Sequence, residues 1–460
     1  MQNAAEYISE LINRARNAQA QIEFESQGKV DEVVKRVAWS GVRPDFSENY
    51  AKLCAEDTAM GYAPHKLAKI QVKIKGVLRD MIGKRSVGVV YENKETGIMK
   101  IAKPMGVVGA LLPVTNGEAT PFIKVLHALK TRNAIILAPH PRAQKTNDTA
   151  TAQIRAALKA SGWPEDLVIG IDEVTLDKSK ELMKQCDIVL ATGGAGMVRA
   201  AYSSGTPSEG VGAGNSVCIV DETADLADAA DKIMRSKTFD YATSCSTENS
   251  VCIEESVYDD MIAELKKAGG YLCSNGEKEQ LQAAMWTEKG LNRDIVAQSP
   301  QTIARIAGID LPEERRFIMV EETGVGKGYP FSGEKLSVVC AVYKWKGFEN
   351  AVDLVNRITT FSGPGHSCGI HTTRDDRILE LSTAVRVSRV MIRQPQCLAN
   401  SGAWTNGMPM SLTLGCGSWG GTSTAGNITW EHLLNYTWVS KPIPSTEPTD
   451  EELFGDIMSE

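Results

Sequence analysis

Five short apolar runs alternate with stretches of helical periodicity between Gly106 and Val220, and this alternation restricts the fold more than any other feature. The runs begin 20 to 33 residues apart and read GVVGALL, AIILA, LVIGI, DIVLA and SVCIV. Short apolar runs separated by helices are typical of parallel strands with both faces of their sheet covered. We therefore predict a doubly wound α/β unit built from these five strands.

The flanking segments predict further units. Residues 1 to about 82 have apolar positions at helical spacing, and residues 85–103 read as two β-runs around the turn-rich ENKETG, hence a hairpin. From residue 214 to about 415 helices and strands alternate again, which indicates a second α/β unit. The polar tail KPIPSTEPTDEE predicts an exposed end. A chain of 460 residues exceeds what one core usually serves, so at least two domains are expected.

Composition excludes several function classes. A net charge of -7 without a dense Lys/Arg block gives no reason to expect nucleic acid as a partner. No run approaches the roughly 18 apolar residues of a membrane span. The 10 cysteines form no CxxC pair, which favours a reducing cytoplasm, and the 6 histidines form neither HExxH nor a compact cluster with cysteine. No metal site is therefore predicted.

The stretch DYATSCSTENS surrounds one cysteine, Cys245, with hydroxyl and carboxamide side chains. This is not a core pattern, so the thiol is expected at a polar boundary that a substrate can reach. Because the thiolate is the nucleophile, such a site needs a lowered thiol pKa or a nearby base. His366, in the Gly/Pro loop FSGPGHSCGI, suits a general base better than a core role.

Asn116 follows the predicted strand GVVGALLPV in the stretch PVTNGEATP. Parallel sheets bind ligands at the carboxyl ends of their strands, and an amide donor placed there can stabilise an oxyanion. A plain Asn-Gly turn explains the same residues.

Three glycine-rich stretches invite a phosphate interpretation. ATGGAGMVRAAY follows a predicted strand and opens a helix, so its backbone N–H groups could face a pyrophosphate, although a simple strand-to-helix turn fits equally well. GVGAGNS precedes a strand and is better explained as a loop lining a site or as a tight turn. GCGSWGG indicates only an unusual backbone.

Together these stretches resemble the aldehyde dehydrogenase superfamily, specifically its CoA-acylating branch. The resemblance extends from about residue 5 to 440, and a set of motifs carries it: PxGVVGxxxPxTN, LKTRNAIILAPHPRA, ATGGAGMVRAAYSSGTP, GVGAGN, SKTFD with Cys245 five residues later, EKLS, GxGH and GCGSWGG. It implies an aldehyde dehydrogenase-like α/β fold. A Rossmann-type cofactor-binding domain would occupy 1–213, including an oligomerisation arm near 85–103. The catalytic domain would occupy 214–418, and 419–460 would form a return segment and oligomerisation tail.

The family pattern assigns Cys245 as the nucleophile, with Asn116 and the Cys245 backbone N–H holding the oxyanion. Hydride would leave for NADP or NAD, and a thioester would remain on the cysteine. Hydrolytic relatives place a water-activating glutamate where this chain has Val211. Without that base, coenzyme A is expected to take the acyl group as co-substrate. His366, at the GxGH position, would assist coenzyme A.

The resemblance also assigns the cofactor-binding residues: Thr115, His140, Pro141, Arg142, Thr192, Gly193, Gly212, Glu334 and Leu336. Glu334 matches the carboxylate that holds the nicotinamide ribose. Where NAD-selective relatives carry a glutamate for the adenosine ribose, this chain has Pro141 followed by Arg142. Loss of that acid and gain of an arginine favour a 2′-phosphate, so we predict that NADP is accepted.

A narrower set of stretches is similar to the acylating sulfoacetaldehyde dehydrogenases: ATSCSTENS, LQAAMW, MVEETGVG, PFSGEKLS and AGNSVCIVDETADL. The substrate implied is a short anionic aldehyde, with Thr243 and Ser244 as donors to its sulfonate and Arg293 and Arg393 as candidate cations. The segment 393–410 departs from that type, which leaves succinate semialdehyde, acetaldehyde and propionaldehyde open.

Other functional alternatives are a hydrolytic aldehyde dehydrogenase and a non-catalytic protein that kept the fold. Val211 opposes the first, and the joint presence of Cys245, Asn116, Glu334 and His366 opposes the second. The resemblance further implies a homodimer or homotetramer.

Overall fold

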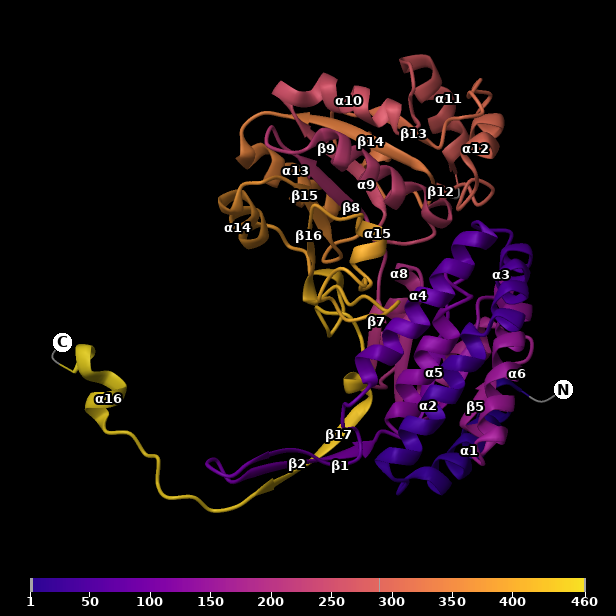
Figure 1. Ribbon diagram of the computed structural model, residues 1–460, viewed down its shortest axis with the longest axis vertical. Helices are drawn as coiled ribbons and strands as arrows, with labels where there is room; N and C mark the ends of the chain where they lie inside the picture. The colour runs from indigo at the N-terminus through magenta and orange to yellow at the C-terminus, as the bar shows by residue number, and fades with distance from the viewer. Residues whose placement is uncertain (1–2, 289, 459–460) are drawn as a thin grey trace.

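The computed structural model describes residues 3–288 and 290–458. It contains two parallel sheets, each covered by helices, and a separate three-stranded sheet that projects as an arm (Figure 1). The mixed α/β architecture predicted from the sequence is confirmed.

Four helices open the chain: α1 (Ala4–Ile22), α2 (Gln27–Val42), α3 (Pro44–Thr58) and α4 (Ala63–Met81). Helix α1 packs against strands of the first sheet, and the other three pack against the helices that cover it. Asn3 and Glu6 form a capping box at the start of α1, and Ser26 caps α2, so local polar residues set where these helices begin. Their apolar stripes are buried, as Ile8 and Val33 show, in one core with the first sheet. The predicted N-terminal helical region is therefore present.

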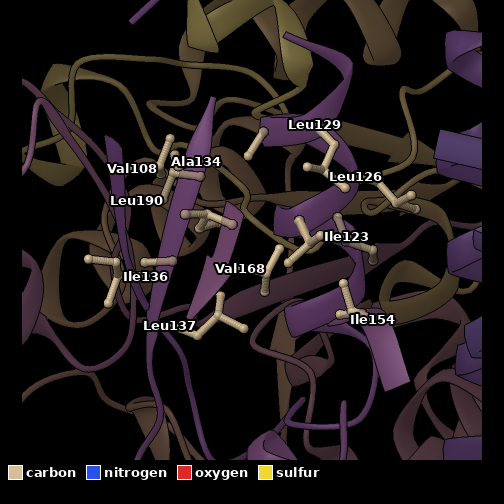
Figure 2. Close-up of a cluster of buried hydrophobic side chains, with 14 of the residues drawn as sticks. Val108, Ile123, Leu126, Leu129, Ala134, Ile136, Leu137, Ile154, Val168 and Leu190 are labelled. Atoms are coloured by element: carbon tan, nitrogen blue, oxygen red, sulfur yellow. The ribbon is translucent and has the colours of Figure 1, made fainter. Parts of the chain in front are cut away.

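The first large sheet has five parallel strands in the order β5-β4-β3-β6-β7. Their bounds are β3 (Val107–Leu111), β4 (Ala134–Ala138), β5 (Val168–Gly170), β6 (Ile188–Thr192) and β7 (Ser208–Val211). The connecting helices are α5 (Thr120–Lys130), α6 (Gln144–Ala160), α7 (Leu176–Gln185) and α8 (Ala195–Tyr202). Figure 2 shows the core between strands and helices, with Ile136 and Leu137 of β4, Val168 of β5, and Ile123 and Ile154 from the helices among its members.

One strand assignment from the sequence was wrong. SVCIV, predicted as the fifth strand of this sheet, is β8 (Ser216–Val220) and belongs to the second sheet, while β7 is the fifth strand of the first. Both sheets are parallel and buried on both faces, so the apolar character of SVCIV identifies a strand but not its sheet.

The second sheet has seven parallel strands in the order β10-β13-β14-β9-β8-β15-β16. The further strands are β9 (Glu248–Glu254), β10 (Gly270–Leu272), β13 (Phe317–Glu321), β14 (Val339–Trp345), β15 (Cys368–His371) and β16 (Val390–Ile392). Seven helices accompany them: α9 (Leu226–Thr238), α10 (Tyr258–Lys267), α11 (Asn275–Met285), α12 (Pro300–Ala307), α13 (Phe348–Phe361), α14 (Asp375–Ala384) and α15 (Gln396–Ala399). A small pair, β11 (Trp286–Thr287) and β12 (Gly290–Leu291), lies outside this sheet. These elements enclose a second core, distinct from the first.

The arm contains the predicted hairpin, β1 (Gly88–Asn93) and β2 (Ile98–Pro104), together with a strand that the sequence did not reveal, β17 (Leu434–Ser440). Before β17 the chain returns to the first core, where Met410, Ile428 and Trp430 are buried. Beyond β17 the tail extends away from the body to the short helix α16 (Asp450–Phe454), as Figure 1 shows. Among the described residues, no helix is long and apolar enough to cross a membrane.

Candidate active site

Cys245 lies between a short 3₁₀ segment, Phe239–Ala242, and the start of β9, and its side chain is partly exposed. His366 Nε2 lies 3.0 Å from Cys245 Sγ, although the two residues are 121 positions apart in sequence. The ring is oriented from behind, because His366 Nδ1 is 2.8 Å from Ser367 Oγ, which in turn is 2.6 Å from Ser216 Oγ. The two residues expected to be nucleophile and base are thus in hydrogen-bond contact.

Burial sets the protonation of this pair. It raises the pKa of the Cys245 thiol to about 12, helped by the carboxyl group of Glu334. Burial also lowers the pKa of His366 to about 3, and the guanidinium of Arg389 acts in the same direction. Before a substrate arrives, the site therefore contains a neutral thiol and a neutral imidazole. Of the two alternatives that the sequence left open, this structure supplies a nearby base and not a lowered thiol pKa.

Three glycine-rich loops pack backbone to backbone around the pair. A Cβ on Gly214 would lie 2.0 Å from the carbonyl oxygen of Cys245. Gly365, at φ +77°, would place a Cβ 1.9 Å from the carbonyl oxygen of Cys416. The stretches GVGAGN, GPGH and GCGSWGG thus require glycine because their backbones touch. The unusual backbone inferred for GCGSWGG is explained by the support it gives to the loop that carries His366.

Glu334 adjoins the nucleophile, as its predicted role at the nicotinamide ribose requires. Its Oε1 accepts a hydrogen bond from the Gly214 backbone N–H at 3.1 Å, so Gly214 contacts both Glu334 and Cys245. Burial raises the pKa of Glu334 to about 7, against the opposing effect of the Gly214 N–H. The Glu334 carboxyl group and the Cys245 thiol are therefore neighbours.

The turn between β6 and α8 has the features of an anion site. Gly194 is the N-cap of α8 and no side chain caps that end of the helix. A Cβ on Gly194 or Gly196 would meet nothing within 4 Å, and one on Gly193 would contact only Met197, at 3.5 Å. The helix N–H groups are thus open to a ligand, which fits a pyrophosphate. Thr192, which precedes the turn, is buried, with its Oγ1 3.3 Å from Thr413 Oγ1.

The turn after β4 contains three of the predicted cofactor residues. The ring of His140 accepts a hydrogen bond from the Arg142 backbone N–H at 3.1 Å, and Pro141 between them is exposed. The Arg142 guanidinium donates to the carbonyl of Thr58 at the end of α3. One of its N–H groups is therefore already used.

The other predicted cofactor residues are spread over the same region. Gly212 lies on the loop after β7, with its Cβ position 4.0 Å from the carbonyl oxygen of Gly420. Leu336, at φ +42°, accepts a hydrogen bond from the Ala297 backbone N–H at 2.8 Å. Thr115 Oγ1 accepts a long hydrogen bond, 3.4 Å, from Asn116 Nδ2.

Asn116 is held by a lysine that the sequence analysis did not identify. Lys69 Nζ donates to Asn116 Oδ1 at 2.8 Å and to Asp240 Oδ2 at 2.8 Å. The same ammonium lies 3.3 Å from the hydroxyl oxygen of Thr243. Lysines are usually exposed, so the only sequence signal was the spacing of Lys66 and Lys69 on one face of a helix.

The substrate-donor assignment of Thr243 does not fit the structure. Its side chain is 1% exposed, and its hydroxyl donates to Asp240 Oδ2 at 2.8 Å. Ser244, by contrast, is partly exposed and shares a 2.9 Å hydrogen bond with Ser246.

The candidate cations also differ from expectation. Arg393 donates to the carbonyl oxygen of Thr372 at 2.6 Å, and the charge of Arg293 acts on His140 rather than on the cysteine. The cation that acts on the pKa of Cys245 is instead the buried Arg389, which donates to the carbonyl oxygen of Gly415 at 2.7 Å. Within the described residues, no group of three or more His, Cys, Asp or Glu side chains is arranged to hold a metal ion.

Comparison with known proteins identifies the family that this chain resembles. The sequence model of the aldehyde dehydrogenase family matches residues 2–293. A sulfoacetaldehyde dehydrogenase of Acholeplasma is 45% identical over 98% of this chain and 94% of its own, and an acylating sulfoacetaldehyde dehydrogenase of Bilophila wadsworthia is 44% identical over 98% of both. The crystal structure of an acetylating aldehyde dehydrogenase from Geobacillus thermoglucosidasius is 34% identical and superposes with a TM-score of 0.94 over 97% of this chain and 98% of its own.

Proposed function

The chain belongs to the aldehyde dehydrogenase family, and we propose that it is a CoA-acylating enzyme that converts sulfoacetaldehyde to sulfoacetyl-CoA with reduction of NADP or NAD. The observation that carries the proposal is the 3.0 Å contact between Cys245 Sγ and His366 Nε2, beside Glu334 and the open turn before α8. Two full-length relatives with that activity in their names support the choice of aldehyde.

In the first step, Cys245 Sγ bonds to the aldehyde carbon while His366 Nε2 accepts the thiol proton. With pKa values of about 12 and about 3, a separated thiolate and imidazolium are disfavoured, so the proton moves as the S–C bond forms. The aldehyde oxygen becomes an oxyanion that accepts hydrogen bonds from the Asn116 amide and the Cys245 backbone N–H.

A nicotinamide cofactor, when bound, supplies the hydride acceptor for the second step. The residues proposed to hold it are Glu334 at the nicotinamide ribose and Gly193 with the N-terminus of α8 at the pyrophosphate. Thr115, His140, Pro141, Arg142, Thr192, Gly212 and Leu336 complete the proposed set. Loss of hydride from the carbon leaves a thioester on Cys245.

The fate of that thioester follows from Val211. This side chain is buried against Leu414 and Cys416, and it has no group that can take a proton from water. The thiol of coenzyme A therefore attacks the acyl carbon and passes its proton to His366, which has by then released the first proton to solvent. The Cys245 sulfur leaves and takes the proton from His366, and acyl-CoA is released. We assign His366 to proton transfer in this step as well, because its Nε2 is the group next to the leaving sulfur.

The test is a panel of sulfoacetaldehyde, acetaldehyde, propionaldehyde and succinate semialdehyde, each assayed with NADP and NAD, with and without coenzyme A. We expect sulfoacetaldehyde to give the highest kcat/KM, NADP to be accepted, and NAD(P)H formation to require coenzyme A. Cys245→Ala abolishes turnover, whereas Cys273→Ala, at the other partly exposed cysteine, leaves it unchanged.

Each part of the proposal has its own contrary result. Another aldehyde leading the panel would overturn the substrate, and turnover without coenzyme A would overturn acylation in favour of hydrolysis. An active Cys245→Ala variant would overturn the mechanism, and absence of turnover with NADP would overturn the expectation for the 2′-phosphate.

We also propose that the enzyme is a cytoplasmic homodimer or homotetramer assembled through the arm. Tyr91 and Trp438 of the arm are 45% and 61% exposed, which is unusual for large apolar rings. The arm also projects away from the body, so a second copy can reach it (Figure 1). Light scattering of the purified protein measures the assembly directly.

A further inference from the structure

Four charged side chains join helix α4 to the segments that carry Asn116 and Cys245. They are Lys66 and Lys69 from α4, Glu118 from the turn after β3, and Asp240 from the 3₁₀ segment before the nucleophile. The four side chains are between 0% and 4% exposed. Two positive and two negative charges balance, so the cluster is neutral as a whole, which makes its burial tolerable.

Lys69 is the member of the cluster that contacts Asn116. Its Nζ lies 2.8 Å from each of three acceptors: Asn116 Oδ1, Asp240 Oδ2 and Glu118 Oε1. Burial alone would lower the pKa of Lys69, but the charges of Asp240 and Glu118 raise it above its usual value, so the ammonium is charged. Its hydrogen bonds go to Asn116 Oδ1, Asp240 Oδ2 and, at 3.3 Å, Thr243 Oγ1, while Glu118 Oε1 is an ion-pair partner.

Lys66 occupies the same environment without that contact. It lies 3.1 Å from Asp240 Oδ2 and 3.5 Å from Glu118 Oε2, and its hydrogen bonds go to these two carboxylates. The two lysines share a helix, their burial and both carboxylates. The chain thus contains its own matched control for the bond to Asn116.

The contact fixes the orientation of the Asn116 amide. An ammonium beside Oδ1 excludes the flipped amide, which would turn two N–H groups toward a positive charge. Nδ2 then has only the 3.4 Å contact with Thr115 Oγ1, so it retains donor capacity for a substrate. The charge also polarises the amide, which strengthens its N–H groups as donors.

The segment before Cys245 does not depend on Lys69 alone. Asp240, at φ +50°, begins three successive residues in the left-handed region, which non-glycine residues rarely adopt. Besides Lys69, its carboxylate binds Lys66, the hydroxyl of Thr243 and the backbone N–H of Tyr62. Loss of Lys69 therefore leaves this turn three of its anchors.

We propose that Lys69 is a positioning residue that holds the Asn116 amide in the orientation required to bind the oxyanion and strengthens its N–H donors. The inference rests on the proposed function, because it takes Asn116 as the oxyanion donor.

The experiment compares Lys69→Met with Lys66→Met, each in the wild-type and the Asn116→Ala background. We expect Lys69→Met to lower kcat about 10²-fold with little change in KM, because the donor it misorients acts in the transition state. Lys66→Met keeps kcat within several-fold of wild type. In the Asn116→Ala background Lys69→Met has little further effect, since the group it positions is gone.

Alkylation of Cys245 by iodoacetamide, which forms no oxyanion, separates positioning from general damage, and its rate stays at the wild-type value in Lys69→Met. Lys69→Gln, whose amide can still donate to Asn116 Oδ1, restores part of kcat. If a methionine variant does not fold, Lys69→Gln is compared with Lys66→Gln, and Lys69→Gln is still expected to lower kcat more, because it lacks the charge beside Asn116 Oδ1.

Equal losses of kcat at the two lysines, a full Lys69→Met effect in the Asn116→Ala background, or a fall in alkylation would each overturn the inference. Failure of the proposed role of Asn116 is recognised separately, by an Asn116→Ala enzyme with wild-type kcat.

Discussion

The two glycine-rich regions of the active site have the same composition and opposite surroundings. At the turn before α8, a Cβ on Gly194 or Gly196 would meet nothing within 4 Å. Around Cys245, a Cβ on Gly214 or Gly365 would overlap a backbone carbonyl oxygen at 2.0 or 1.9 Å. In the first region glycine leaves room for a ligand, and in the second it lets three loops touch. A glycine count alone therefore does not identify a phosphate site.

The difference also accounts for the electrostatics of the two regions. The packed loops bury His366 and cover part of Cys245, and desolvation by burial is the main cause of both pKa shifts. The open turn instead exposes uncapped helix N–H groups, which favour an anion. The nucleophile thus lies on the enclosed side, and the proposed pyrophosphate site lies on the open side.

Among the substitutions that test this comparison, Gly365→Ala is expected to have the largest effect on kcat and on stability. The new Cβ meets a backbone oxygen and the residue sits at φ +77°, so the loop must shift and carry His366 away from Cys245. We expect kcat to fall about 10²-fold and the free energy of unfolding to fall by about 1 to 3 kcal/mol. Steady-state kinetics and thermal unfolding measure both. A variant with wild-type kcat and thermal midpoint would show that the loops are not in tight contact.

The open turn was within reach of sequence reasoning, whereas the packed loops were not. A strand, paired glycines and a helix follow one another in ATGGAGMVRAAY, so the local pattern predicts the geometry. The contact between Cys245 and His366 spans 121 positions, and no local pattern encodes it. The sequence marked His366 as a candidate general base, but no pattern in it placed the ring beside Cys245. The location of SVCIV in the second sheet was missed for a similar reason, since the apolar pattern of a strand does not specify which strands it pairs with.

Buried charged side chains were the other feature that the sequence did not predict. Lys69 and Arg389 act directly on catalytic groups, yet isolated Lys and Arg residues in a sequence normally predict a solvated surface. Thr243 was assigned to the substrate because it lies close to Cys245 in sequence, but its side chain is buried and its hydroxyl contacts Asp240. Proximity in sequence correctly placed Thr243 near Cys245, but its hydroxyl binds Asp240 and is not directed to a substrate.

An intermediate effect is expected from pH on the alkylation rate of Cys245, and it tests how strongly the packed loops bury the thiol. Because burial raises the pKa of Cys245 to about 12, the thiolate fraction of the free enzyme grows about tenfold per pH unit throughout the range below that value. We expect the rate of Cys245 alkylation by iodoacetamide, measured without cofactor between pH 7 and about 9.5, to rise continuously. Cys273→Ala removes the other partly exposed thiol from the measurement. A plateau near pH 7 would mean a stabilised thiolate and an open, polar environment.

The smallest effect is expected from Gly196→Ala, the same substitution as in Gly365→Ala but placed in the open turn. Its Cβ meets no atom, and alanine suits the first turn of α8 better than glycine, so stability should rise by about 0.5 to 1 kcal/mol. The added methyl group occupies space proposed for the pyrophosphate, so KM for NADP should increase several-fold while kcat and Cys245 alkylation stay unchanged. The two substitutions add the same atom, so opposite signs in unfolding free energy follow from the surroundings of each site and from the left-handed backbone of Gly365. A destabilised Gly196→Ala variant would mean that close packing requires glycine at this turn as well. An unchanged KM for NADP in that variant would contradict a cofactor site at the turn.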